Sequence, residues 1–202
     1  KTPEADERLA FQAGATRVWF PTYEEIYPPG FPVLSAGPLG EKFEGASRPG
    51  HFDGVVTVVR RLFDLVKPDV ALFGEKDFQQ LALVRTIAHE VEIIAVPTVR
   101  ETDGLALSSR NIRLSSGGRK AAPIIYKALS AAATAKSVSE MNHRLQDVLA
   151  QESALTIDYA TIIDESTFDI ATDQTEHKRA IVAGWIDGVR LIDNMPMGAA
   201  QG

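Results

Sequence analysis

The chain of 202 residues contains no cysteine. This absence excludes disulfide bridges, zinc sites built on thiolates and cysteine nucleophiles, and it suits a cytoplasmic protein. The sequence also lacks any apolar run approaching the roughly 20 residues that a membrane-spanning helix needs. No signal-peptide pattern is visible at its beginning. We therefore expect a cytoplasmic protein that has no membrane partner.

An excess of positive charge is also missing, because the formal net charge is -6. A general attraction to nucleic acid is therefore not expected, although a local basic pocket remains compatible with this charge. Hydrophobic residues make up 45% of the chain and charged residues 24%, as in ordinary globular proteins.

Two phosphate-binding motifs are absent as well. Neither a Walker A sequence nor G-x-G-x-x-G occurs, which excludes a P-loop enzyme and an ordinary dinucleotide-binding protein. The four histidines, at positions 51, 89, 143 and 177, show no metal-ligand spacing. We predict no protein-built metal site.

The first half of the chain alternates between strand and helix patterns. Apolar residues recur at helical spacing over residues 53–66, and short apolar runs at 70–73 and 91–96 predict strands on either side of a helix at 79–88. A helix ending near Gly14 and a strand at residues 16–20 precede them. Alternating strands and helices with short connections indicate an α/β fold with a parallel sheet. The Pro- and Gly-rich residues 27–51 predict a partly ordered lid or wall.

The pattern changes after Pro97. The next segment is polar and rich in turn residues, and then residues 120–135 and 138–151 predict two helices, with Pro123 in the first turn of the earlier one. Strand patterns follow at residues 158–163, 179–185 and 189–192, with a tight Asp187-Gly188 turn between the last two. We predict two domains, residues 1–97 and a small α+β domain at 98–202.

The sequence Gly74-Glu75-Lys76-Asp77 directly follows a predicted buried strand. Open α/β sheets bind ligands outside the carboxyl ends of their strands. Gly74 permits close approach of a ligand to the backbone, and the charge of Lys76 can attract a phosphate group. Asp77 can accept hydrogen bonds from sugar hydroxyls or help position a metal. A solvated strand-to-helix turn explains these residues equally well.

A second polar cluster is Ser108-Ser109-Arg110-Asn111. Its hydroxyls, backbone amides and guanidinium are donors that suit phosphate oxygens. The alternative is a polar loop that contains an incidental arginine.

Taken together, four stretches resemble the pantothenate synthetase (pantoate–β-alanine ligase) family. They are SRPGHFDGVVTVV, FGEKDFQQLALVR, VPTVRETDGLALSSRNIRLS and the closing RLIDN. The resemblance runs in order along essentially the whole chain. It implies a Rossmann-like, nucleotidylyltransferase-type parallel sheet followed by a small α+β domain that forms a lid over the nucleotide.

The same resemblance implies the activity and its site. Members join pantoate to β-alanine through a pantoyl adenylate, with ATP as substrate, Mg²⁺ expected, and a homodimer as the usual assembly. Gln80 corresponds to a pantoate-binding residue, and Lys76 would stabilise charge on the phosphates. The positions that correspond to ATP contacts are Gly74, Glu75, Lys76, Asp77, Val99, Leu107, Ser108, Ser109 and Arg110.

Two features of the family pattern are missing here: the His-x-Gly-His motif and the first glutamine of the pantoate site. We therefore expect the chain to be a C-terminal portion whose Rossmann-like sheet is incomplete at the N-terminus, and to be inactive alone. The connection from Ala88 to Val91 is also shorter than usual. A non-catalytic nucleotide-binding or dimerisation fragment remains the alternative. Adenylyl transfer to another carboxylate is disfavoured by the joint presence of Gln80 and PTVRE.

Overall fold

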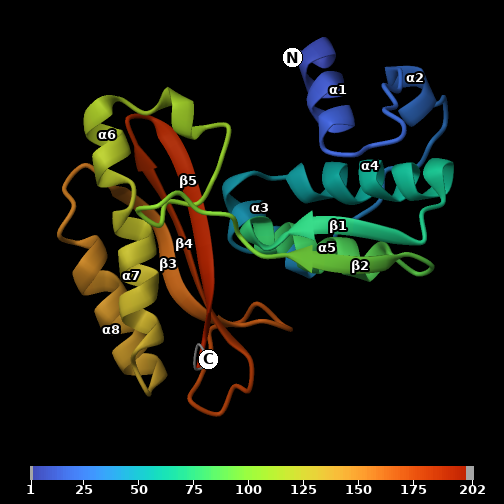
Figure 1. Cartoon of the computed structure of the whole chain (residues 1–202). Coiled ribbons are helices and arrows are strands. Elements are labelled where there is room, and N and C mark those ends of the chain that lie inside the picture. Colours follow the sequence, from blue (N-terminus) through green and yellow to red (C-terminus); the bar gives the residue numbers. More distant parts are fainter. Residues whose placement is uncertain (1, 199–202) are drawn as a thin grey trace. The chain divides into compact units, whose positions relative to one another are not determined.

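The computed structural model describes residues 2–198, which divide between Val33 and Leu34 into two compact units (Figure 1). The domain boundary that the sequence predicts near residue 98 lies inside the second unit and remains a prediction.

The first unit contains two helices, α1 (Pro3–Gln12) and α2 (Tyr23–Ile26). A capping box begins α2, because the Glu25 amide donates to the Thr22 hydroxyl while the Glu25 carboxylate accepts from the Thr22 amide. The strand predicted at residues 16–20 is wrong. A strand needs a hydrogen-bonded neighbour, and no segment among residues 2–198 pairs with these residues.

The second unit contains a helix–strand–helix–strand succession that confirms the α/β prediction. The elements are α4 (His51–Val66), β1 (Val70–Gly74), α5 (Phe78–Ile87) and β2 (Glu92–Val96). The two strands pair in parallel, from Val70 opposite Glu92 to Gly74 opposite Val96. The parallel register brings the C-terminal ends of both strands to the same edge of the sheet.

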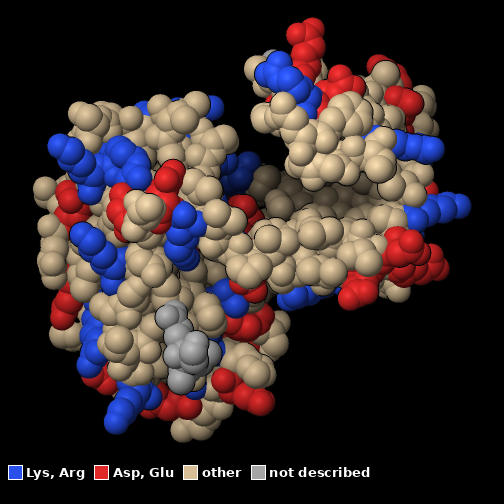
Figure 2. Space-filling view, in the orientation of Figure 1, with Lys and Arg blue, Asp and Glu red and all other residues tan. Residues whose placement is uncertain are grey.

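One face of this parallel sheet packs on α4 and α5. Val59, Phe63 and Val84 of the helices contact Ala71 and Phe73 of β1. On the opposite face, Leu72 of β1 is 67% exposed and Ile94 of β2 is 42% exposed. Figure 2 shows mostly uncharged surface over these two strands. Parallel sheets usually have both faces covered, so half of the normal helix cover is absent from the second unit as described.

The Pro- and Gly-rich segment is ordered where the structure places helix η1 (Pro38–Glu41) and helix α3 (Glu44–Ser47). Gln79 holds it: its side-chain amide donates to the carbonyls of Leu39 and Lys42, both at 2.8 Å, and its oxygen accepts from the Glu44 amide at 3.1 Å. This confirms a partly ordered segment, and its C-terminal part forms a wall of the pocket described below.

The rest of the second unit packs helices on an antiparallel sheet. The helices are η3 (Asn111–Arg113), α6 (Ser116–Ala121), α7 (Ile124–Ala133) and α8 (Val138–Leu149). The strands β3 (Thr156–Asp164), β4 (Lys178–Ile186) and β5 (Val189–Met197) lie in the order β3-β4-β5. Leu129, Leu145 and Val182 are fully buried in the core between the helices and the sheet.

Two predictions for this half need correction. The single helix expected over residues 120–135 is interrupted before α7, with Pro123 at the N-cap position, because proline lacks an amide and its ring obstructs the preceding turn. The last strand does not stop at Ile192 but continues to Met197, and Pro196 is tolerated since β5 is an edge strand. The Asp187-Gly188 turn is confirmed, with φ of 53° and 72° as a type I′ hairpin requires.

Across residues 2–198, none of the helices combines the length and the apolar character that crossing a bilayer demands.

Candidate active site

A pocket lies where β1 ends, and its empty space together with the adjoining open solvent measures about 560 Å³. Helix η2 (Glu75–Asp77) makes the turn from β1 into α5 and brings Lys76 and Asp77 to its lining, and Gln80 reaches it from the first turn of α5. Arg110 joins them from the predicted phosphate-binding segment. Four of the residues singled out in the sequence thus share one pocket, although Arg110 is remote from the others along the chain.

A smaller pocket of about 360 Å³ shares Lys76 and Arg110 with the first and adds Ser108. Ser108 accepts a hydrogen bond from the Arg110 amide at 3.2 Å, which folds the segment locally. The Lys76 side chain is 20% exposed, and its amino group lies 3.9 Å from the Asp77 carboxylate. Lysine and arginine side chains therefore border both cavities, an arrangement suited to an anion.

The other predicted contacts do not line these two pockets. Val99 and Leu107 are 61% and 45% exposed, and the Leu107 amide donates to the Val99 carbonyl at 2.9 Å. Ser109 is exposed. Glu75 contributes its backbone carbonyl to the turn rather than its side chain to the pocket.

Gly74 has no structural need to be glycine. Its φ is -70° and its ψ is 133°, values open to any residue. A Cβ added there would meet no described atom within 4 Å. The space over Gly74 is therefore free for a ligand, which agrees with the reason that the sequence suggested for a glycine at this position.

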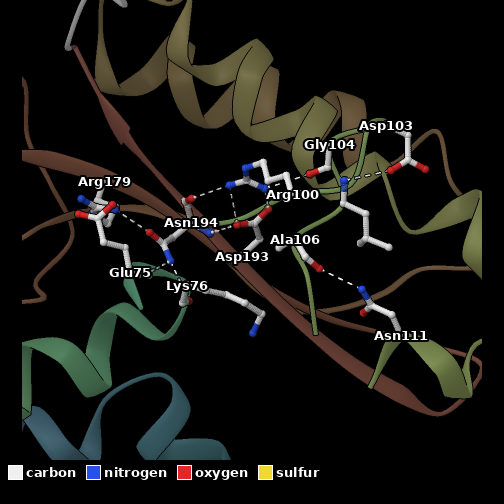
Figure 3. Close-up of polar contacts among 11 residues, drawn as sticks. Glu75, Lys76, Arg100, Asp103, Gly104, Ala106, Asn111, Arg179, Asp193 and Asn194 are labelled. Carbon is white, nitrogen blue, oxygen red and sulfur yellow. Dashed lines mark hydrogen bonds and ion pairs between the residues drawn. The ribbon is translucent and has the colours of Figure 1, made fainter. Parts of the chain in front are cut away.

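The turn is held by strand β5, as Figure 3 shows. The Asn194 side-chain amide donates to the carbonyls of Glu75 and Lys76, both at 2.9 Å. Its oxygen accepts from Arg179 at 2.6 Å. Arg179 in turn binds Glu165 at 2.8 Å and lies 3.9 Å over the Phe78 ring. These contacts fix the pocket's lysine-bearing side to the antiparallel sheet.

A second ion pair lies beside this network. Arg100 binds the Asp193 carboxylate through two hydrogen bonds of 2.5 and 2.9 Å, and its guanidinium lies 4.6 Å from the centre of the Tyr126 ring. Asp193 is 5% exposed. Its charge is therefore already paired, and it is poorly placed to serve as a free carboxylate in the pocket.

The opposite wall carries a buried cluster around Arg190. Arg190 binds Glu44 and Asp158, each at 2.6 Å, and the Tyr159 hydroxyl donates to Glu44 at 2.8 Å. Burial, together with the Glu44 charge, raises the pKa of Tyr159. Burial opposes the charge of Arg190, but its hydrogen bonds to Glu44 and Asp158 raise its pKa. The cluster ties α3 to the sheet.

His51 lies at the start of α4 and lines the larger pocket. Burial and the neighbouring Arg48 charge lower its pKa from the ordinary value of 6.5. Its Nε2 lies 3.0 Å from an Arg48 nitrogen, which fits a neutral ring accepting from the guanidinium. Among residues 2–198, no group of three His, Cys, Asp or Glu side chains is arranged to hold a metal.

Sequence reasoning assigned no role to Glu44, Arg179, Asp193 or Asn194. The contacts of Glu44 and Asn194 reach far along the chain, because 146 residues separate Glu44 from Arg190 and 118 separate Lys76 from Asn194. The one available signal was the closing RLIDN, which places charged and amide side chains in an otherwise apolar strand. A buried polar side chain needs a partner, so such a pattern points to a network.

The fold and the pocket define an α/β protein that has a candidate ligand site at the carboxyl end of a parallel strand. Lysine and arginine side chains line this site. The family model described as pantoate-beta-alanine ligase matches residues 1–196. The chain therefore belongs to the pantoate-beta-alanine ligase family.

Individual relatives agree with this assignment. The pantothenate synthetase of Acidothermus cellulolyticus is 48% identical over 214 aligned positions, which cover 100% of this chain and 70% of the relative. That of Thermus thermophilus is 46% identical, with 95% and 73% covered. The solved Thermus thermophilus pantothenate synthetase superposes with a TM-score of 0.91 at 45% identity, covering 96% of this chain and 74% of that one.

A more distant solved structure is the pantoate-beta-alanine ligase of Francisella tularensis in complex with beta-gamma ATP and β-alanine. It matches with a TM-score of 0.74 at 28% identity, covering 97% of this chain and 70% of that one.

Proposed function

We propose that this chain carries the ATP- and pantoate-binding part of a pantothenate synthetase, which joins pantoate to β-alanine. In the first step a pantoate carboxylate oxygen attacks the α-phosphorus of ATP, and pyrophosphate leaves. In the second, the β-alanine amine attacks the acyl carbon of the adenylate, and AMP leaves. The observation that carries the proposal is the meeting of Lys76, Gln80 and Arg110 at one pocket.

Each residue has a chemical role in this proposal. Lys76 is the catalytic residue, because its ammonium offsets the negative charge that grows on the departing pyrophosphate. Gln80 holds pantoate through amide hydrogen bonds. Arg110 and Ser108 bind phosphate oxygens, and Arg110 can do so with two parallel donors. The remaining ATP contacts are Gly74, Glu75, Asp77, Val99, Leu107 and Ser109.

Magnesium enters this proposal with ATP rather than as a resident ion. Mg²⁺ at such sites is held by one or two carboxylates together with substrate phosphates. Glu44 and Asp193 are already paired with arginines, whereas Asp77 lines the pocket with its side chain 51% exposed. Asp77 is therefore the carboxylate that would hold a Mg²⁺ ion entering with ATP, and such an ion would offset charge on the phosphates. We also propose a homodimer and a cytoplasmic location.

We expect the 202 residues alone to be inactive. Adenylation requires the ATP phosphates and the pantoate carboxylate to be held together, an arrangement that can lower the barrier by roughly 7–11 kcal/mol. Lys76, Gln80 and Arg110 provide one side of it. The sequence has no His-x-Gly-His to provide the other.

Two proteins test this. One is the 202-residue chain, and the other, called here the completed enzyme, joins it to the part of the Acidothermus cellulolyticus relative that the match leaves uncovered. Both are assayed for AMP release with ATP, pantoate, β-alanine and Mg²⁺. We expect release only from the completed enzyme, and only when pantoate is present. Turnover by the short chain would refute its inactivity, and none by either would favour the alternative, a non-catalytic nucleotide-binding or dimerisation fragment.

Gly74→Ala tests ATP placement separately. The described chain has room for the added methyl group, so folding stability should hardly change, whereas ATP lying on the turn would clash. We expect calorimetry to show at least a tenfold loss of ATP affinity, about the effect of one 1.4 kcal/mol clash. Gly54→Ala, also with free space but in α4, is the matched control. Unchanged ATP affinity in Gly74→Ala would place the nucleotide elsewhere.

A further inference from the structure

We propose that Asn194 is a positioning residue that holds the Glu75–Asp77 turn so that Lys76 faces the bound phosphates. The idea rests on the proposed function, because it gives Lys76 its phosphate role. It adds a residue from β5, in the other half of the second unit, to the machinery of the pocket.

The hydrogen bonds of Asn194 leave only one orientation for its amide. Arg179 can only donate, so the group facing it must be the Asn194 oxygen. The carbonyls of Glu75 and Lys76 can only accept, so the group facing them must be the NH₂. Both amide hydrogens are thereby used on two successive residues of one turn. No carboxylate or hydroxyl of similar size could reproduce this set.

The Asn194 side-chain amide is also held in place by buried neighbours. Arg179, whose side chain is 7% exposed, is fixed by Glu165 at 2.8 Å and by the Phe78 ring. Asn194 itself is 5% exposed, and its backbone amide donates to Asp193 at 2.8 Å. The side chain therefore cannot rotate without leaving buried polar groups unpaired, which costs free energy.

The place of the two hydrogen bonds explains their effect on Lys76. They bind the peptide carbonyls on either side of the Lys76 α-carbon, so they fix the direction in which its side chain leaves the turn. The turn itself is only three residues long. A residue misplaced by about 1 Å can cost a catalytic step a factor of roughly 10², so this support matters for function beyond stability.

Asn194→Asp separates positioning from folding. It keeps an oxygen for Arg179 but sets a second oxygen against the two carbonyls, so the turn should be released while the sheet is preserved. Asn142→Asp is the matched control, because the Asn142 amide donates to a single helix carbonyl far from the pocket. Asn194→Ala serves as a second variant should the aspartate disturb folding.

The first measurement needs no ligand. Hydrogen exchange followed by mass spectrometry should show the segment 74–80 exchanging about tenfold faster in Asn194→Asp, the loss expected from roughly one net hydrogen bond. Segments in β4 and α7 should keep their rates, as should every segment in the control. An unchanged turn, or an equal acceleration across the sheet, would overturn the proposal.

The second measurement is a double-mutant cycle on ATP affinity in the completed enzyme, with Lys76→Ala as the other change. If Asn194 acts through Lys76, Asn194→Asp should weaken ATP about tenfold in the parent and less than twofold beside Lys76→Ala. Additive effects would make Asn194 merely structural. If Lys76→Ala alone leaves ATP binding unchanged, the proposed role of Lys76 fails. The hydrogen-exchange measurement still decides whether Asn194 holds the turn.

Discussion

The two segments of the pocket that we propose to bind phosphate are held in opposite ways. The Glu75–Asp77 turn is bound by Asn194 at two carbonyls, and that side chain is fixed by Arg179. The segment 107–110 is largely exposed, and its hydrogen bonds within the described part of the chain are short-range. Contacts from distant segments therefore hold the lysine side of the pocket, whereas contacts with nearby residues hold the arginine side in the described part of the chain.

This difference suits a reaction with two demands. The group that stabilises developing charge should already be in place, because reorganisation during the reaction would raise the barrier. The group that covers the nucleotide must let substrates in and then exclude water from the adenylate. We therefore interpret residues 108–110 as a mobile clamp that closes over the nucleotide, opposite the firmly held Glu75–Asp77 turn.

The largest effect is expected from Lys76→Ala, which removes the charge from the rigid side. In the completed enzyme, pantoate-dependent exchange of pyrophosphate into ATP should fall by about 10²–10³, the usual scale for one preorganised donor. The fold should survive, because the carbonyls that Asn194 binds belong to the backbone.

Lys127→Ala is the matched control, since Lys127 is an exposed lysine on α7. If Lys76→Ala keeps the exchange rate within a few-fold of the parent, the Glu75–Asp77 turn does not carry the catalytic charge. The difference between the two segments would then have no functional meaning.

The next largest effect is expected from Gln80, the residue that we propose to bind pantoate. Gln80→Leu should weaken pantoate by about 10–100-fold and ATP much less, because pantoate polar groups lose their partner. Calorimetry with each substrate measures the two affinities. The neighbouring Gln79 is buried and holds the Pro- and Gly-rich segment, so Gln79→Leu should instead lower the folding stability.

Equal losses of pantoate and ATP affinity in Gln80→Leu would count against the assignment of this residue to pantoate. Gln151→Leu, at an exposed position, should change neither affinity.

The sequence predicted the parallel strands, the charged turn and the meeting of Lys76 with Gln80, because these depend on local periodicity and on residues four apart. It did not predict the support from Asn194, Arg179 and Glu44. The contacts of Glu44 with Arg190 and of Asn194 with the turn join segments more than 100 residues apart, and Arg179 meets Glu165 and Asn194 only through the pairing of the antiparallel strands. The break before Pro123 was missed since the helical pattern continued through it.

Arg110→Lys tests the mobile side and should have a smaller effect. Lysine keeps the charge but loses the paired donors of the guanidinium, so ATP affinity and retention of the adenylate should each fall about tenfold. Folding stability should not change, because Arg110 is exposed. Normal affinity together with normal retention would show that the segment is not a clamp. Arg85→Lys, an exposed change on α5, controls for the substitution itself.

The smallest effect is expected from the cluster of Glu44, Asp158 and Arg190 and is a pH-dependent change in folding stability. A hydrogen bond from Arg190 lowers the pKa of Asp158 below its ordinary value of 3.8, so the ionised form stabilises the folded chain. That contribution is complete above pH 3.8 and is lost as the pH falls through the lower folded-state pKa. Asp158→Asn should therefore cost about 1 kcal/mol at pH 7, and the difference from the parent should shrink as the pH falls below 3.8. Urea unfolding across this range measures it, with the exposed Asp69→Asn as a control. A difference in folding stability that is independent of pH would assign the loss to packing. It would contradict an electrostatic contribution from the Arg190–Asp158 pair.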